Sequence, residues 1–433
     1  MNSPRNVIYL VVATALMLLC LPAQTVAQVV VANIPLGQTP TSIAVNSQTN
    51  TVYATCQSPT TLKVVDGGTN TLTATIPLNS IFFAPVGIAA NATTNRVYVD
   101  DFVHGVWVLD GATNAVLAVV NLPIGVVKIA VNPVTNLVYV GNKEERSITV
   151  IDGDANSPAE NSVIGVIPMP SYFGGDLVVN PVTNRLYVVT NAFDFETNKF
   201  RSLTVIDGST NTVIASPLND VFPGSLGVNP VTNKAYMVNG SGNFKLEVFD
   251  AADASHLTTV TLNFGLNRLA VNPTTNRIHI TEPDLGAIWT IDGSNNTFIR
   301  YGLNLHKPFP GPLAVNPVTS FVYVANGGSE PLHGGQSISV IDDPPAPVVQ
   351  FHALLETVSA YNLANGISNS LDSKLQNALA ALESLNSGPN GTVCNKLDAF
   401  INEVESHKEL TTAQTNDLIT AAIRIRRTLG CAL

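Results

Sequence analysis

Three charged side chains, those of Lys128, Asp176 and Arg268, stand at corresponding positions of a repeated sequence pattern. Each one directly precedes an Ile or Leu that begins a short apolar run. If the repeats close into a ring, these side chains converge on its centre, where they could anchor an anionic or hydroxyl-rich ligand. They could also neutralise one another as a hydrated ion-pair plug, and the sequence leaves both interpretations open. The other repeats carry Ser42, Gly87, Ser225 and Pro312 at this position.

A second group of candidate ligand-binding residues lies in the segments that differ most from one repeat to the next. Residues shared by nearly all copies are explained by turn and strand-end structure, so function is expected where the copies differ. These variable segments are rich in aromatic side chains, which provide large contact surfaces for a partner. The candidates are Phe82, Phe83, Tyr172, Phe173, Phe222, Phe264, Glu282, His306 and Phe309.

The familiar catalytic motifs are missing from the sequence. It contains no Gly-x-Ser-x-Gly, no phosphate-binding loop and no dinucleotide fingerprint. Its histidines lack metal-ligand spacing with a carboxylate partner, so we predict neither a metal site nor a cofactor. His279 replaces a Tyr of the other repeats and is interpreted as a packing side chain. An enzyme of lactonase or lyase type is the alternative, with Glu282, His306 and Arg268 acting at the mouth of a central channel.

The elements that would position these residues are seven copies of one unit. Each copy contains a segment similar to VNPVTN, and the segments begin 41 to 49 residues apart at Val45, Ala90, Val131, Val179, Val228, Val271 and Val315. Each copy then reaches an Asp before a second turn, at Asp66, Asp110, Asp152, Asp207, Asp250, Asp292 and Asp342. Repeats of this length with several short strands are typical of propeller blades.

One copy can be divided into four strands by its turn residues. Pro and Asn between the first two strands, and Asp-Gly after the third, are typical of tight turns. In the third copy we expect strands at 129–132, 137–141, 147–151 and 163–167. The last copy meets Pro344 and Pro345 where its fourth strand should begin, and residues 29–36 resemble a fourth strand. We therefore predict a seven-bladed β-propeller over residues 28–343, closed by its N-terminal strand.

The repeats also resemble a known family. The run VNPVTNRLYVVTN from Val179 and the run VIDGSTNTV from Val205 are similar to the YVTN-type repeats of bacterial surface-layer-related β-propellers, over residues 28–343. This resemblance implies the propeller fold and export from the cell. It implies no particular chemistry, because propellers host unrelated functions.

After a Pro-rich linker at 344–348, the apolar spacing becomes helical, which predicts a small α-helical bundle at 349–433. Four helices are expected at 348–361, 368–385, 393–407 and 412–429. Thr411 and Gln414 fit a capping box. Cys394 opens the third helix and Cys431 follows the fourth, a placement suited to a disulfide between them. The sequence around Cys394 resembles the FIMAH-type C-terminal module of exported bacterial proteins, whose matching cysteines pair, and this implies an accessory or interaction role.

The N-terminus predicts export. Arg5 precedes an apolar run at 7–21, and the small residues before position 28 suit cleavage, so residues 1–27 are interpreted as a signal peptide. No later segment is apolar enough to span a membrane. We expect a secreted, periplasmic or cell-surface protein.

Charge and composition narrow the choice of partner. Only 12% of the residues are charged against 45% hydrophobic, and the formal net charge is −10, which disfavours nucleic acid. We expect a monomeric, non-catalytic propeller that binds a protein or a cell-envelope glycan through its variable loop face.

Overall fold

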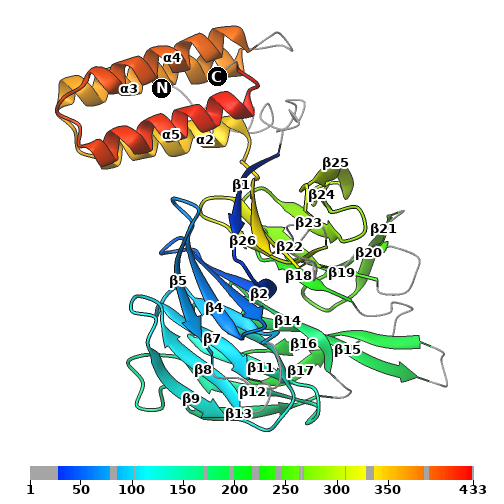
Figure 1. The fold of residues 1–433 in the computed structure, drawn as a ribbon. Helices are drawn as coiled ribbons and strands as arrows, with labels where there is room; N and C mark the ends of the chain where they lie inside the picture. Colours follow the sequence, from blue (N-terminus) through cyan, green and yellow to red (C-terminus); the bar gives the residue numbers. More distant parts are fainter. Residues whose placement is uncertain are drawn as a thin grey trace, which may run out of the picture. The chain divides into compact units, whose positions relative to one another are not determined.

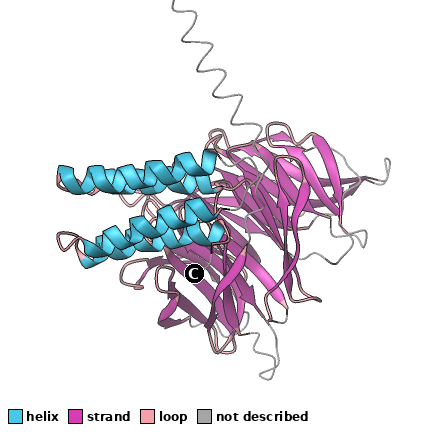
Figure 2. Ribbon diagram, turned by 90° about the horizontal axis from the view of Figure 1, so that it is seen from above, coloured by secondary structure: helices cyan, strands magenta, loops and turns pink. Residues whose placement is uncertain are grey.

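The computed structural model of the chain describes residues 28–78, 85–101, 104–169, 173–194, 199–216, 224–239, 245–262, 265, 268–307, 309–327, 336–384 and 390–431. The predicted signal peptide and the candidates Phe82, Phe83, Tyr172, Phe222 and Phe264 lie outside these residues. The chain divides into two compact units, Gln28–Pro344 and Pro345–Leu433. Figure 2 shows the strands of the first unit in magenta and the helices of the second in cyan.

The first unit consists of seven four-stranded antiparallel sheets, which confirms the predicted seven-bladed β-propeller (Figure 1). The first strands of the sheets are β2 (Thr39–Asn46), β6 (Ile88–Asn91), β10 (Val126–Asn132), β14 (Phe173–Asn180), β18 (Leu226–Asn229), β22 (Leu269–Asn272) and β26 (Pro310–Asn316). The second strands are β3 (Thr51–Gln57), β7 (Arg96–Asp101), β11 (Leu137–Asn142), β15 (Arg185–Asp194), β19 (Lys234–Val238), β23 (Arg277–Glu282) and β27 (Phe321–Asn326).

The third and fourth strands follow the second strand toward the outer edge of each sheet. The third strands are β4 (Thr61–Asp66), β8 (Gly105–Asp110), β12 (Ser147–Asp152), β16 (Lys199–Asp207), β20 (Lys245–Asp250), β24 (Ala287–Asp292) and β28 (Ser337–Asp342). The fourth strands are β5 (Thr71–Pro77), β9 (Val116–Asn121), β13 (Val163–Pro168), β17 (Thr212–Ala215), β21 (His256–Thr261), β25 (Thr297–Asn304) and β1 (Val29–Pro35). The first strand of each sheet contacts that of the next, and β26 contacts β2, so the sheets form a closed ring.

The N-terminal strand closes the ring, as the sequence predicts. β1 pairs antiparallel with β28, from Val29 opposite Asp342 to Pro35 opposite Ser337. The last blade is therefore built from both ends of the propeller. Side chains of β1 also enter an apolar cluster shared by the first and last blades, where Ile34 packs with residues of β3 and β28.

The repeated Asn and Asp residues build the turns, as expected. Asn46 accepts hydrogen bonds from the backbone N–H groups of Gln48 and Thr49, and Asn50 closes the same turn with a positive φ of 51°. Asn tolerates this left-handed conformation better than most residues. The Asn46 amide also donates to Asn95 Oδ1 of the next blade at 2.8 Å, so these turns link neighbouring sheets.

The second unit is a bundle of four helices, α2 (Pro347–Ala360), α3 (Asn365–Glu383), α4 (Gly391–Ser406) and α5 (Thr412–Thr428). α2 begins inside the predicted 344–348 linker because Pro347 occupies a first-turn position, which the fixed φ of proline suits. Thr411 and Gln414 form the predicted capping box at the start of α5. Within the described residues, none of the helices is both long and apolar enough to cross a membrane.

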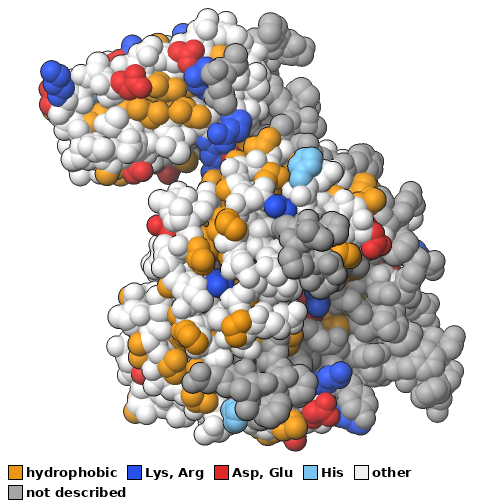
Figure 3. Space-filling model, viewed as in Figure 1, with side chains coloured by type: hydrophobic (Ala, Val, Ile, Leu, Met, Phe, Trp, Pro, Cys, Tyr) orange, Lys and Arg blue, Asp and Glu red, His pale blue; other side chains and the backbone are white. Residues whose placement is uncertain are grey.

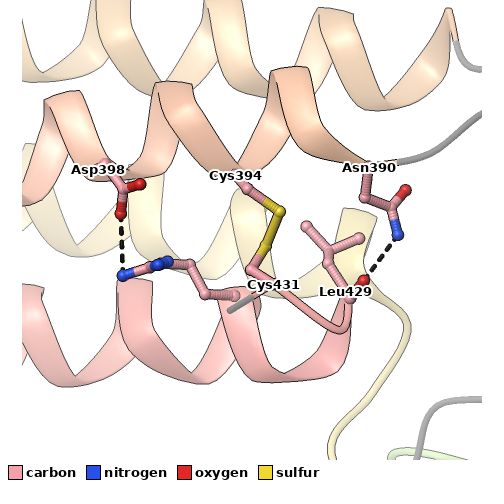
Figure 4. The surroundings of a disulfide bond; sticks show 6 residues. Asn390, Cys394, Asp398, Leu429 and Cys431 are labelled. Atoms are coloured by element: carbon pink, nitrogen blue, oxygen red, sulfur yellow. Dashed lines mark hydrogen bonds and ion pairs between the residues drawn. A yellow bond between two sulfur atoms is a disulfide. The ribbon is translucent and has the colours of Figure 1, made fainter. Parts of the chain in front are cut away.

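A disulfide joins Cys394 and Cys431 across 37 positions of sequence, as predicted (Figure 4). Two further contacts link the same two helices. Asn390 donates to the carbonyl oxygen of Leu429 at 2.7 Å, and Arg426 forms an ion pair with Asp398 at 2.8 Å. The remaining cysteine of the described chain, Cys56, is a buried thiol of the propeller, where burial raises its pKa to about 12.

Candidate functional site

A cavity of about 560 Å³ lies at the centre of the ring. Its walls are first-strand residues, because the first strand of every sheet is innermost. Of the predicted ring positions, those that line the cavity are Ser42, Lys128, Asp176, Ser225, Arg268 and Pro312. The seventh position, Gly87, lies between two lining residues, Val86 and Ile88. The positions that the repeat pattern assigned to the centre of the ring therefore lie at the central cavity.

Two of the three converging charges form an ion pair. Lys128 Nζ lies 2.9 Å from Asp176 Oδ1, and the Asp176 side chain is only 6% exposed. Burial alone would raise the pKa of Asp176, but the Lys128 ammonium, the backbone N–H of Leu226 and the Arg268 guanidinium together hold it below its ordinary value. Asp176 is therefore a carboxylate at neutral pH.

The Asp176 carboxylate is also saturated with hydrogen bonds. Its Oδ1 atom accepts the backbone N–H of Leu177 at 3.0 Å in addition to the lysine. Its Oδ2 atom accepts the hydroxyl of Ser225 at 3.1 Å and the backbone N–H of Leu226 at 2.8 Å. These bonds tie the blade that carries Asp176 to the blade on each side of it.

Arg268 differs from the other two charged residues because its side chain is exposed. Its backbone is held by Thr281 on the adjacent strand: the Arg268 N–H lies 3.2 Å from Thr281 Oγ1, and the Thr281 N–H donates to the Arg268 carbonyl. Among the described residues, no carboxylate lies within 4.0 Å of its guanidinium. The cavity wall thus combines one internal ion pair with one cation that faces the cavity.

Asp100 is a buried carboxyl beside the ring. It exchanges hydrogen bonds with Gly87, whose N–H donates to Asp100 Oδ1 at 3.0 Å. Its Oδ2 atom is buried and has no hydrogen-bond partner within the described part of the chain. Burial raises its pKa to about 7, so it changes charge near neutrality. The sequence could have pointed to Asp100, because the second strands of the other blades carry an uncharged residue at the equivalent position.

A second, open pocket of about 590 Å³ lies on the sixth blade and its connection to the seventh. His306 and Phe309 both line it, and both have positive φ angles, 53° and 50°. The Phe309 side chain is 55% exposed. The remaining lining residues are Pro283, Asp284, Leu285, Gly286, Asn304 and Lys307. Of the predicted aromatic candidates, Phe309 is thus placed at a pocket, whereas Phe173 begins β14 with only its backbone described.

Glu282 is the last residue of β23 and lines neither pocket. It is buried, and burial raises its pKa while hydrogen bonding from the backbone N–H groups of Asp284 and Leu285 acts to lower it; its Oε2 atom has no hydrogen-bond partner among the described residues. Asn142 makes the same bonds to Glu144 and Glu145 in the third blade. Arg268 thus lines the central cavity, His306 lines the second pocket, and Glu282 lines neither of these two.

A buried polar cluster that the sequence interpretation missed joins the sixth blade to the seventh. Its centre is the fully buried carboxylate of Asp343. Its partners are Gln28 Nε2 (2.5 Å), Arg277 Nη1 (2.6 Å), Asn272 Nδ2 (2.8 Å), Thr275 Oγ1 (2.8 Å) and His279 Nε2 (3.0 Å). Burial favours the neutral acid, but His279 and Arg277 hold the pKa of Asp343 far below its usual range.

His279 therefore does more than replace a packing aromatic ring. In other blades the corresponding Tyr reaches the Asp-Gly turn of the next blade: a Cβ added at Gly153 would lie 2.5 Å from Tyr98 Oη, and one at Gly293 would lie 2.9 Å from Tyr236 Oη. The shorter His279 leaves room for Asp343 at that glycine position. In most other blades the asparagine equivalent to Asn272 donates to the turn asparagine of the next blade, as Asn46 donates to Asn95. In the seventh blade Ser320 replaces that turn asparagine, and Asn272 donates to Asp343 instead.

Comparisons with known proteins support the fold alone. Neither a protein-family model nor a curated protein sequence matches the chain. Among solved structures, the chain resembles hydrazine synthase of Kuenenia stuttgartiensis, with a TM-score of 0.58 and 13% sequence identity. The match covers 70% of this chain and 95% of that chain. At this identity the likeness extends to the propeller architecture and not to chemistry.

Proposed function

We propose that this protein is an exported, non-catalytic β-propeller that binds a protein or a cell-envelope glycan through its variable loop face. The loop face is the side of the ring formed by the connections from second to third strands and from fourth to first strands. The ring positions that line the central cavity lie where the first strands begin, and the second pocket is formed by two loops of this kind. The central cavity, together with a second pocket that carries the exposed Phe309, is the observation that supports binding.

Among the described residues, the face of the propeller drawn in Figure 3 offers little electrostatic attraction for a highly charged polymer. Figure 3 shows charged side chains scattered singly over the propeller among hydrophobic and uncharged polar ones. The alternative, an enzyme of lactonase or lyase type, would need Glu282, His306 and Arg268 in one cluster. Arg268 and His306 line two different pockets and Glu282 lines neither of them, an arrangement that favours the binding proposal over this alternative.

Export and accessory roles complete the proposal. The resemblance to YVTN-type propellers and to FIMAH-type modules supports a location outside the cytoplasm, and the Cys394–Cys431 disulfide suits an oxidising compartment. In this proposal residues 1–27 direct export, and the helical unit supplies a second contact.

A pair of matched variants tests which face binds. Phe309 on the loop face is 55% exposed, and Val318 in the VNPVTS turn on the opposite face is 73% exposed. Residues 28–433 would be screened on a cell-envelope glycan array and by pull-down from envelope proteins, with Phe309→Ala and Val318→Ala alongside. We expect Phe309→Ala to weaken the captured interaction and Val318→Ala to leave it unchanged. No captured ligand, or equal effects of the two variants, would contradict the proposal.

A further inference from the structure

The central cavity carries a net positive charge within a protein of net charge −10. Its lining residues include three ionisable side chains, Lys128, Asp176 and Arg268, and the other lining residues are apolar or uncharged. Two cations and one carboxylate leave one positive charge in excess. The excess is local, because the chain as a whole is acidic.

The one carboxylate among the described lining residues of the cavity already has its full set of hydrogen bonds. The Asp176 carboxylate receives the Lys128 ammonium, two backbone N–H groups and the Ser225 hydroxyl. A ligand hydroxyl or amine therefore finds no free carboxylate in the described wall. The Ser225 hydroxyl is occupied on both sides as well, since its oxygen lies 3.2 Å from the N–H of Leu269.

The cavity also contains a strong hydrogen-bond donor, the Arg268 guanidinium, that is open to a ligand. Arg268 is exposed, and in the described residues its guanidinium has no carboxylate within ion-pair distance. A guanidinium presents N–H groups in a planar fork that matches the two oxygens of a carboxylate. The cavity lining also includes the apolar residues Val228, Leu269 and Val271, which offer contact to the apolar parts of a ligand.

We infer that the central cavity binds the carboxylate of an acidic saccharide, with Arg268 as the residue that receives it. The inference rests on the proposed function and specifies its ligand. In this arrangement the Lys128–Asp176 ion pair holds neighbouring blades in register and positions the wall, and Arg268 alone pairs with the ligand. The cavity volume of about 560 Å³ is sufficient for a small ligand or the end of a chain.

The test compares sugars that differ only in the carboxyl group. An array would carry saccharides that contain uronic or sialic acids, each printed beside its carboxyl-reduced neutral counterpart, and would be probed with residues 28–433. We expect the bound acidic saccharides to exceed their reduced counterparts in affinity by about tenfold or more, the usual effect of a hydrogen bond to a charged group. Free inorganic phosphate would be titrated in parallel.

Variants of Arg268 test whether the preference for acidic saccharides depends on this residue. Arg268→Gln should abolish the preference for the acid, and Arg268→Lys should retain only part of it because the lysine cannot form the bidentate contact. The matched control is Arg185→Gln, which removes the same charge from the opposite turn face, where Arg185 bonds to the Ala252 carbonyl at 2.9 Å. We expect the control to bind like the wild type, and the melting temperature of Arg268→Gln to equal that of the wild type, since the Arg268 guanidinium forms no ion pair among the described residues.

The outcomes separate this inference from the proposed function. Loop-face binding of glycans without a preference for acids would overturn the inference and leave the proposed function standing. The same applies if the preference survives in Arg268→Gln, or if inorganic phosphate binds as tightly as the acidic saccharides. Absence of any glycan or protein ligand would overturn both.

Discussion

Replacing Asp343 tests whether the buried cluster stabilises the seam between the sixth and seventh blades. Asp343→Gly removes a carboxylate that receives five side chains and leaves Arg277 as a buried cation, 10% exposed, without its partner. Removing one member of a buried ion pair costs about 3 to 5 kcal/mol. A loss of this size corresponds to a fall in melting temperature of about 5 to 8 °C for a domain of this size.

The neighbouring blades show how the loss could be reversed. His279→Tyr alone should also destabilise, because a Tyr hydroxyl at this position approaches the side chain of residue 343 as closely as Tyr98 approaches a Cβ at Gly153. The double variant His279→Tyr/Asp343→Gly restores the Tyr-Gly arrangement of the other blades. Arg277 keeps its bond to the Pro344 carbonyl, as Arg185 bonds to that of Ala252. Adding Ser320→Asn restores the acceptor for Asn272.

The assay is a double-mutant cycle on the propeller melting transition, measured by calorimetry on residues 28–433. We expect the double variant to recover at least half of the stability lost in Asp343→Gly, and the triple variant to recover more. If the losses of the two single variants simply add in the double variant, the two positions are not coupled and the reasoning fails.

The same cluster predicts a pH dependence with a definite sign. The pKa of Asp343 is depressed in the folded protein, so its stabilising contribution is complete above the unfolded carboxyl pKa of about 3.9. That contribution is lost as the pH falls from there toward the folded pKa. The melting-temperature difference between wild type and Asp343→Asn should therefore stay constant near neutrality and shrink below about pH 4. A difference that grows in acid would contradict this sign.

Two further predictions concern the ends of the chain. Deleting residues 28–36 removes β1 from the last blade and should lower and broaden the propeller melting transition in calorimetry; an unchanged transition would show that ring closure does not depend on this strand. Replacing both Cys394 and Cys431 with Ser should lower the free energy of unfolding of the helical unit by about 4 kcal/mol, from the entropy of the closed loop. Chemical unfolding followed by helical circular dichroism measures this loss, and an equal loss in the Cys56→Ser control would argue against it.

The repeat pattern contained most of the fold because each turn depends on local chemistry. Asn50 takes a positive φ and Asn46 caps its own turn through short-range bonds, and neither needs tertiary information. The ring positions followed from the register of the first strands. Whether the three ring charges pair with one another could not be predicted, because the Lys128–Asp176 distance depends on how two blades pack.

The Asp343 cluster could not be predicted by comparing the copies one by one, because it is formed by residues of two blades. His279 departs from the repeat pattern in the sixth copy, and Ser320 and Asp343 depart from it at two separate turns of the seventh, so the three look like unrelated substitutions. Only packing of the sixth blade on the seventh makes them parts of one network. Glu282 shows that the sequence does not predict burial: its position among variable loop residues made it a ligand-binding candidate, and in the structure its side chain is buried, which raises its pKa.

The most direct test of a binding function on the loop face is a structure of residues 28–433 with the ligand captured in the glycan screen. We predict an acidic saccharide in the central cavity, with its carboxylate within hydrogen-bond distance of the Arg268 guanidinium and the Lys128–Asp176 pair intact. A ligand bound instead on the opposite face, around the turn that carries Val318, would contradict this account.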